Sequence, residues 1–300
     1  MPVILTGNFY VEFKGEIMLI NFKEAFTFMF KDEKFWQKYL IGTAFGIIPF
    51  TAMGILMHQY GKLSNSPQIG EILGLLGLFL ITSLGGILLF FSIGFGVKYA
   101  NAKIAIGTNE LPEWGGNFKN IFIDGIKLWA GMLLISACGG LIISVFQFII
   151  NIIAGIIGIV LGFNGASKEE ISSIIVILGA VLIVFTVIIY SIFIIFMYLS
   201  MSSFLVDKNV LAVFNFKRIW SLLKGNFLNL ILIFLIFVPF YVFSLLIFLL
   251  PIICSVVLII TNFYIMMVLY NLLAQYVQIG TKKNQERLEA KKLQENISEN

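Results

Sequence analysis

The sequence predicts an all-α membrane protein with about six transmembrane helices, and three observations lead to this prediction. First, 59% of its residues are hydrophobic and 12% are charged, against a charged fraction of roughly 25% in soluble domains. Second, its mean hydropathy is +0.99, and a soluble globule of this length could not bury so much apolar surface. Third, long stretches without Asp, Glu, Lys or Arg recur along the chain. Lipid must therefore be the solvent for much of its surface.

These charge-free stretches place the spans, because a transmembrane helix needs about 20 apolar residues. The predicted spans cover residues 39–61, 72–97, 128–167, 171–206, 228–250 and 252–278. The third and fourth stretches are each long enough for one long span or a cramped pair. Pro251 marks a turn between the last two spans, and Pro239 is expected to kink the fifth.

The distribution of Lys and Arg decides between these alternatives. With one span in each long stretch, every basic residue except Lys62 and Lys168 falls on one side of the membrane. This is the positive-inside pattern, whereas two spans within residues 128–167 would spread the basic residues evenly. We therefore predict a multi-pass protein of a prokaryotic cytoplasmic membrane with both termini in the cytoplasm. The third helix is then long or tilted, or is followed by an apolar interfacial stretch. The glycines expected to loosen its outer end are Gly155, Gly158, Gly162 and Gly165.

A threefold repeat organises the chain. The tripeptide Asn-Phe-Lys begins at Asn21, Asn117 and Asn215, each time just ahead of a pair of spans. Apolar residues follow each copy at helical spacing, with Lys and acidic residues between them. We interpret each copy as an amphipathic helix in the membrane plane that leads into a two-span hairpin. A single six-span domain is expected over residues 21–280, with repeats at about 21–98, 117–206 and 215–280.

Three groups of residues are candidates for function. The basic and aromatic residues of the repeats are expected at the lipid interface, where Lys and Arg face anionic headgroups. These residues are Lys23, Lys119, Lys217, Arg218, Trp114 and Trp220. A cytoplasmic loop combines Glu113, Trp114 and Asp124, which suit either docking of a partner or structural roles as an interface anchor and a helix N-terminal charge. The few polar residues inside the spans include Gln147, Asn262 and Asn271, which suit either interhelical hydrogen bonds or a polar path.

The chain has one histidine, His58, and two cysteines, Cys138 and Cys254, in apolar surroundings. No metal site, cofactor or disulfide framework is expected from such a set. Neither Glu113 nor Asp124 has sequence neighbours that would activate water, so no catalytic residues are predicted. The small net charge of +4 reflects membrane topology, and no nucleic-acid partner is expected.

Two segments carry a family resemblance. The sequence Gly107-Thr-Asn-Glu-Leu-Pro-Glu-Trp114, followed by Phe122-Ile-Asp-Gly-Ile-Lys127, resembles a prokaryotic membrane-protein family catalogued as domain of unknown function 4013. Residues 214–220 through 274–276 are similar to the last third of that family. The resemblance covers roughly residues 20–280 and implies six spans, but it brings no established activity. The threefold unit is more loosely similar to the membrane domain of some glycerophosphodiester phosphodiesterases, in architecture only.

The two ends of the chain are expected to lie outside this domain. Residues 1–20 form an N-terminal extension, and Lys14-Gly15-Glu16 is what a ribosome-binding site encodes when translated in frame. We therefore hypothesise that translation starts at Met18; N-terminal sequencing that finds an intact Met1 would contradict this. Residues 281–300 form a polar cytoplasmic tail, either a short helix near lipid or, as we favour, a loosely ordered segment.

Three functions remain open. The leading hypothesis is a non-enzymatic membrane module that binds an unidentified membrane-protein partner or organises lipid, because basic interfacial helices recur and catalytic groups are lacking. A transporter or lipid-translocating permease is the first alternative, and it requires a polar path among Gln147, Asn262 and Asn271. An interfacial lipid-modifying enzyme is the second, and its candidate acids are Glu110, Glu113 and Asp124.

Overall fold

The computed structural model describes residues 9–13, 16–62, 69–116, 118–163, 167–224, 226–246 and 250–298. Helices dominate these residues, which confirms the predicted all-α membrane class. Five candidate spans are long and apolar enough to cross a membrane, or six when the bent pair α7–α8 counts as one. This agrees with the prediction of about six. The grouping into hairpins with interfacial helices in the membrane plane stays a prediction.

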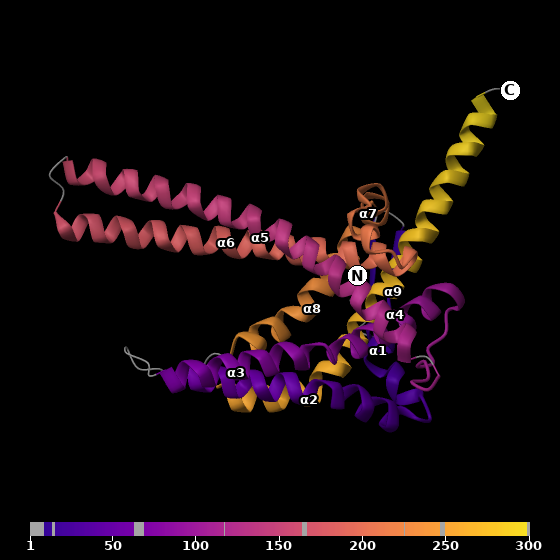
Figure 1. Ribbon diagram of the computed structural model, residues 1–300. Coiled ribbons are helices and arrows are strands. Elements are labelled where there is room, and N and C mark those ends of the chain that lie inside the picture. Colours follow the sequence, from indigo (N-terminus) through magenta and orange to yellow (C-terminus); the bar gives the residue numbers. More distant parts are fainter. Residues whose placement is uncertain are drawn as a thin grey trace.

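In the first predicted repeat, α2 (Phe35–Tyr60) is one span, and α3 (Ile69–Gly86) and α4 (Leu89–Ile106) together form the next. A turn at residues 87–88 separates α3 from α4, but Ile69–Ile106 counts as a single candidate span. The second predicted repeat contains α5 (Phe118–Phe163) and α6 (Lys168–Asp207), which lie side by side along their length (Figure 1). The third predicted repeat contains α8 (Phe227–Leu245) and α9 (Pro251–Ser298). Pro239 lies within α8, and Pro251 begins α9 as expected, because proline suits the first turn of a helix.

The Asn of the repeated tripeptide is a helix cap. Asn21 accepts a hydrogen bond from the Glu24 N–H at the start of α1 (Phe22–Thr27), and Asn215 caps α7 (Phe216–Leu223) in the same way through the Arg218 N–H. Asn117 lies outside the described residues. The second copy differs from the prediction of a separate short helix, because Phe118 is already the first residue of the long helix α5. The short 3-10 helices η1 (Phe28–Lys31) and η2 (Val210–Phe214) complete these connections.

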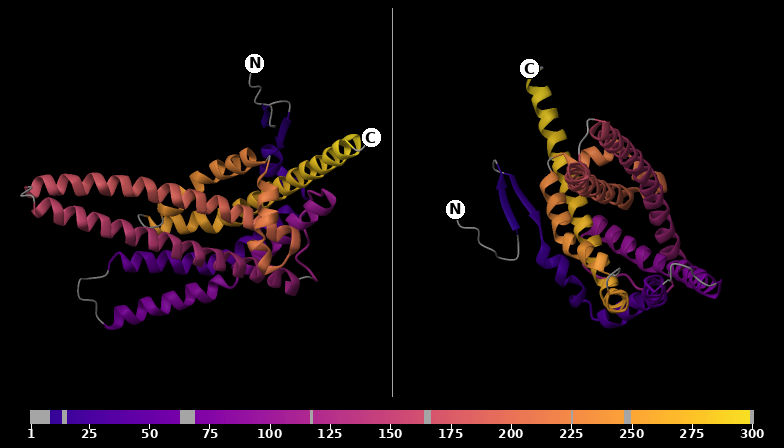
Figure 2. Two further views of the ribbon diagram at one scale, coloured as in Figure 1. Left: turned by 90° about the horizontal axis from the view of Figure 1, so that it is seen from above. Right: turned by 90° about the vertical axis from the view of Figure 1, so that its left-hand side faces the viewer.

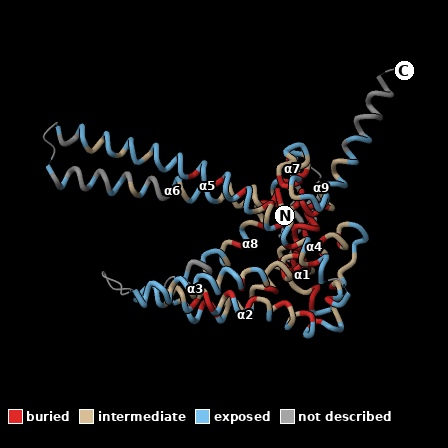
Figure 3. The backbone as a smooth tube through the Cα atoms, in the orientation of Figure 1, coloured by how far each residue is buried: buried red, intermediate tan, exposed pale blue. Residues whose placement is uncertain are grey.

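Figure 1 shows two long arms, α2–α3 and α5–α6, that leave one junction and diverge. The junction is formed by α1, the first turns of α2, α4, the loop at residues 107–116, α7, the inner ends of α5 and α6, and the middle of α9. Buried residues concentrate there, whereas the arms are mostly exposed (Figure 3). The core contains large aromatic side chains, among them Phe28 stacked on Tyr99 and Phe95 stacked on Trp114.

The third span is a long helix, which was one of the two alternatives, because α5 continues past Gly155 and Gly158 to Phe163. Two local features differ from the prediction. The residues after Thr281 are not loosely ordered, because α9 continues as a helix to Ser298; this segment is rich in the helix-favouring residues Lys, Glu, Gln and Leu. The N-terminal extension contains an unpredicted antiparallel hairpin of β1 (Phe9–Phe13) and β2 (Glu16–Ile20), which extends away from the helical body in Figure 2.

Glycines bring α4 and α5 into close contact. A Cβ atom added to Gly94 would overlap the carbonyl oxygen of Ile121, and one added to Gly125 would overlap that of Phe90. The backbones of the two helices therefore touch, as small residues permit between helices in membranes. Gly42 also lies in close contact with another helix, because it faces the Phe263 ring of α9, whereas nothing lies near Gly70 or Gly74 within the described part of the chain.

Replacing Gly125 with valine should destabilise the protein by roughly 3 kcal/mol or more, because the added atoms meet backbone that cannot move aside without separating α4 from α5. Gly140→Val on the same helix is the matched control, since open space surrounds Gly140. Thermal unfolding of both variants in lipid nanodiscs tests this, and equal midpoints would contradict the close crossing.

Candidate functional site

The junction contains two buried lysines, and each is surrounded by groups from distant parts of the chain. Lys38 lies in the first turns of α2 and Lys103 near the end of α4. Their side chains are 6% and 4% exposed. A buried ammonium group must be paired and hydrogen-bonded, so these two residues fix the structure around them. Both lysines lie at the span ends near which most of the basic residues of the chain are found.

Lys38 ties the loop at residues 107–116 to the start of α2. Its Nζ atom lies 2.9 Å from Asp32 Oδ2 and 3.3 Å from Glu113 Oε1. It also donates a hydrogen bond of 2.8 Å to the Leu111 carbonyl oxygen. Three acceptors thus match the three donors of an ammonium group. Lys34 adds a second cation beside Glu113, at 3.3 Å.

The Asp32 carboxylate is the buried counterion of Lys38. Burial alone would raise its pKa, but the hydrogen bond from Lys38 and the positive charge of Lys38 lower it. The backbone N–H groups of Lys34 and Leu111 also donate to Asp32, at 2.8 and 3.1 Å. Together these contacts hold the pKa of Asp32 below its usual value. Glu113 is exposed, and hydrogen bonds from Lys38 and Lys34 lower its pKa as well.

Trp114 is part of the core. Its indole N–H donates to the Lys38 carbonyl oxygen at 3.1 Å, and its ring stacks on Phe95 with 4.1 Å between centroids. Only 4% of the residue is exposed. The expectation of Trp114 at the lipid interface is therefore wrong. The aromatic ring is enclosed because Asp32 and Lys38 both bond to the loop and hold it over the ends of α2 and α4.

Lys103 joins three further segments. Its Nζ atom lies 2.5 Å from Glu24 Oε1 on α1 and 2.5 Å from Asn109 Oδ1 in the loop. Gln278 on α9 donates to the Lys103 carbonyl oxygen at 2.6 Å. An open pocket of about 350 Å³ lies here. Its lining consists of Asn21, Glu24, Lys103, Gly107, Asn109, Gln275, Gln278 and Ile279.

A chain of amides extends from this pocket into the core. Gln275 accepts a 2.7 Å hydrogen bond from the Asn21 N–H and donates one of 2.7 Å to Asn271 Oδ1. Asn271 donates to the Tyr99 hydroxyl at 2.5 Å. Asn271 thus acts as an interhelical hydrogen-bonding group between α9 and α4, which is one of the two roles considered for it.

The three polar residues proposed for an intramembrane path are not brought together. Asn271 is buried in the junction, Asn262 is half-buried nearer the start of α9, and Gln147 is exposed on the α5 arm. In the described part of the chain, no side-chain hydrogen bond joins Asn262 or Gln147 to another residue. Asn151, which the sequence reading overlooked, lies one helical turn beyond Gln147 and is also exposed.

The predicted interface residues separate into two groups. Lys23, Lys119, Lys217 and Trp220 are exposed, Trp220 to 67%. Arg218 pairs with Asp207. On α1, however, Phe22 and Ala25 are buried against the protein, so this part of its apolar face is not free for lipid. Asp124 is half-exposed on α5 and forms no ion pair among the described residues, whereas Glu113 is held by Lys34 and Lys38.

The site residues that the sequence reading missed are Lys38, Asp32, Lys103 and Glu24. All four lie outside the predicted spans, and sequence position alone does not distinguish a solvated lysine from one folded under a loop. No local pattern of charges in the sequence marks which of these residues pair. No group of residues suited to a metal ion occurs in the described ranges.

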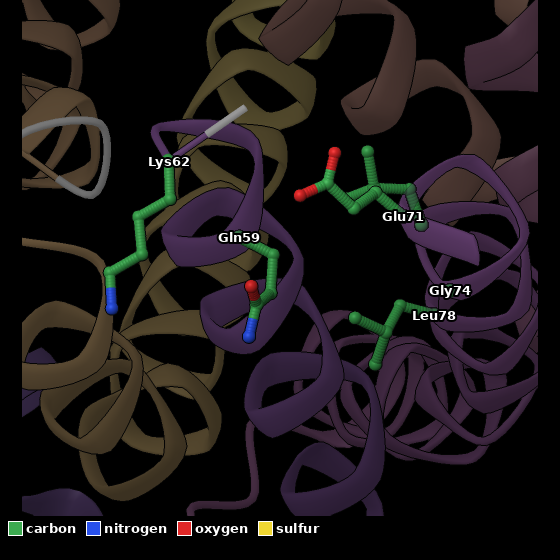
Figure 4. Close-up of a pocket in the computed structure, with 6 residues that line it drawn as sticks. Gln59, Lys62, Glu71, Gly74 and Leu78 are labelled. Carbon is green, nitrogen blue, oxygen red and sulfur yellow. The ribbon is translucent and has the colours of Figure 1, made fainter. Parts of the chain in front are cut away.

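A second pocket lies at the opposite end of the molecule, between α2 and α3, with a volume of about 230 Å³. Its lining includes Gln59, Lys62 and Glu71. In Figure 4 the Glu71 carboxylate points across the opening toward α2, while the Lys62 amine turns away from it. This pocket lies at the far end of α2 from the junction and is separate from it.

The family described as protein of unknown function (DUF4013) matches residues 78–252, more than half of the chain. The chain therefore belongs to this family, which confirms the resemblance seen in the loop at residues 107–114. The matched region contains Lys103, Asn109 and the whole α5–α6 arm, but not Glu24, Lys38 or Gln275. No curated protein and no solved structure matches the chain.

Acid should release the loop from Lys38. Because the pKa of Asp32 is lowered by folding, its stabilising effect is complete above the unfolded-state pKa of about 3.9 and is lost as the pH falls through the folded-state pKa. In a variant with Phe at positions 36, 129 and 220, emission from Trp114 should stay constant down to about pH 5 and shift to longer wavelength below about pH 4.

Asp32→Asn in the same single-tryptophan background is the control. This variant leaves a buried ammonium group without its counterion, so its emission should already be shifted at neutral pH and show no acid transition. Emission from the parent protein that does not move on acidification would contradict the role assigned to Asp32.

Proposed function

We propose that this member of the DUF4013 family is a non-enzymatic scaffold of the cytoplasmic membrane, whose α5–α6 arm binds a transmembrane helix of a partner protein. In this proposal both termini and the junction lie in the cytoplasm, where the basic residues contact anionic lipid. The observation that carries the proposal is a stripe of unpartnered polar and small residues along the arm.

This stripe, the α5 stripe, recurs every three or four residues and so follows one face of the helix. Its members are Gly140, Ser144, Gln147, Asn151, Gly155 and Gly158. Ser144, Gln147 and Asn151 are exposed, and nothing in the described structure lies within 4 Å of a Cβ atom placed on Gly140, Gly155 or Gly158. Helix α6 therefore does not cover this face.

Amides in a lipid environment favour a hydrogen-bonding partner. The side-chain amides of Gln147 and Asn151 form no hydrogen bonds with other described residues, and lipid tails offer none. Small residues beside them would let a second backbone approach closely, and the amides would then bond across the interface. A polar stripe bordered by small residues thus suits a transmembrane helix better than it suits acyl chains.

The length of the arm supports the same proposal. At 1.5 Å per residue, the 46 residues of α5 and the 40 of α6 extend about 69 and 60 Å. The hydrocarbon core of a bilayer is only about 30 Å thick. By comparison, α8 has 19 residues and extends about 28 Å. Association with another protein is one way to accommodate so long an apolar hairpin, and strong tilting is the other.

The cytoplasmic edge supports lipid contact. The exposed residues Lys23, Lys119 and Lys217 lie at the beginnings of α1, α5 and α7, and Phe216 and Trp220 project from α7. Cations with adjacent aromatic rings suit the headgroup region of an anionic leaflet. The permease and enzyme alternatives gain no comparable support. The polar residues required for a permease path are not brought together, and Glu113, a candidate acid of the enzyme, is ion-paired with Lys34 and Lys38.

A photoreactive amino acid tests the proposal when placed at Ser144 in the native membrane. Phe146 is the matched control, because it lies at the same depth but about 200° around the helix and is also exposed. We expect a protein adduct from position 144 and lipid adducts alone from position 146. Gln147→Leu combined with Asn151→Leu should reduce the protein adduct at least several-fold.

Lipid adducts alone at both positions would contradict partner binding and favour a tilted, lipid-covered arm. An adduct between two copies of this chain would identify the partner as a second copy. Equal protein adducts at both positions would contradict a specific role for the α5 stripe.

A further inference from the structure

The pocket beside Lys103 has the chemistry of a ligand site, and this is independent of the partner proposed for the arm. Its volume of about 350 Å³ lies within the usual range of roughly 300–1,000 Å³ for small-molecule sites. It opens where α1, the end of α4 and α9 meet, on the side of the membrane that carries the basic residues. Ile106, which precedes the lining residue Gly107, is 78% exposed.

One wall of the pocket carries opposite charges side by side. Lys103 and Glu24 form an ion pair, and Asn109 is the second partner of Lys103. An ammonium group has three donors, so one donor of Lys103 remains for a ligand. Glu24 bonds Lys103 through Oε1, and its side chain is 24% exposed. Its other carboxylate oxygen is thus available as an acceptor.

The remaining wall is neutral and held in place. Gln275 is fixed by hydrogen bonds in both directions with the Asn21 backbone. Gln278 is held by the Lys103 carbonyl oxygen. Asn21 is itself the cap of α1. A pocket whose lining groups are already oriented loses little entropy on binding.

We propose that this pocket binds a zwitterionic group in which a primary ammonium and a phosphate lie two carbons apart, as in phosphoethanolamine. The ligand ammonium donates to Glu24, and its phosphate accepts from Lys103 and the amide of Asn109. A ligand with only an anion would place its charge against the Glu24 carboxylate, and like charges in a partly buried site are disfavoured. A quaternary ammonium has no N–H to donate to Glu24.

The same chemistry has two sources, a phosphatidylethanolamine headgroup and a free phosphoethanolamine ester. Native mass spectrometry of the full chain, released from vesicles containing equal amounts of phosphatidylethanolamine, phosphatidylcholine and phosphatidylglycerol, distinguishes lipid classes. Addition of soluble glycerophosphoethanolamine to the same protein then tests whether the headgroup alone binds. We expect phosphatidylethanolamine to be retained at least tenfold over the other two lipids. Binding of the soluble ester without lipid preference would assign the free compound as the ligand.

Two variants and one control connect this binding to the pocket. Glu24→Gln removes the acceptor charge, and Gln278→Met alters the wall without touching the ion pair. Asp207→Asn breaks the ion pair with Arg218, which lies outside the pocket, and controls for the loss of an ion pair elsewhere in the protein. Retention of the zwitterion should fall at least tenfold in Glu24→Gln and severalfold in Gln278→Met, but stay within twofold in Asp207→Asn. Equal retention of all three lipids with no binding of the soluble ester, or equal losses in Glu24→Gln and Asp207→Asn, would overturn the proposal.

Discussion

Two lysine ammonium groups lie inside the junction, and the cost of removing them from water determines what must surround each one. Lys38 is bonded to Asp32, Glu113 and the Leu111 carbonyl oxygen, and Lys103 is bonded to Glu24 and Asn109. An unpaired buried charge would cost several kcal/mol. The loop at residues 107–116 supplies partners to both lysines, so its path is fixed by two charges on different helices. Trp114 is enclosed as a consequence.

The arms obey a different constraint. Away from the junction, α2–α3 and α5–α6 bury few side chains and expose apolar ones, which only lipid or another membrane protein can cover. The outer half of the α5–α6 arm is therefore held mainly through the junction, whereas α2 also packs against the start of α9, where Gly54 lies against Ser255. Within the junction, the backbones at Gly94 and Gly125 join α4 to α5, and the hydrogen-bonded chain from Asn21 to Tyr99 joins α1, α9 and α4.

Much of this architecture was predictable, for reasons that also explain the failures. Span positions followed from gaps between charges, since lipid excludes charge along a whole helix. The Asn-Phe-Lys repeat was visible as a pattern, but its physical basis, Asn21 and Asn215 as helix caps, required the structure. The contact between Gly94 and Gly125 could not be predicted, because many glycines in this chain share similar spacing. The junction lysines were missed because pairing across distant segments leaves no local signal.

The contrast between junction and arms also bears on the two proposed sites. In the junction, buried polar atoms form hydrogen bonds and ion pairs within the chain. At the pocket beside Lys103 this network reaches the surface, where hydrogen-bond donors and acceptors remain available. On the α5 stripe, Gln147 and Asn151 lie far from any such network. An amide exposed in lipid favours association with a second helix, whereas an ion pair at the membrane surface favours a ligand that carries both charges. The two sites therefore differ in the kind of molecule they select, and one can be altered without changing the other.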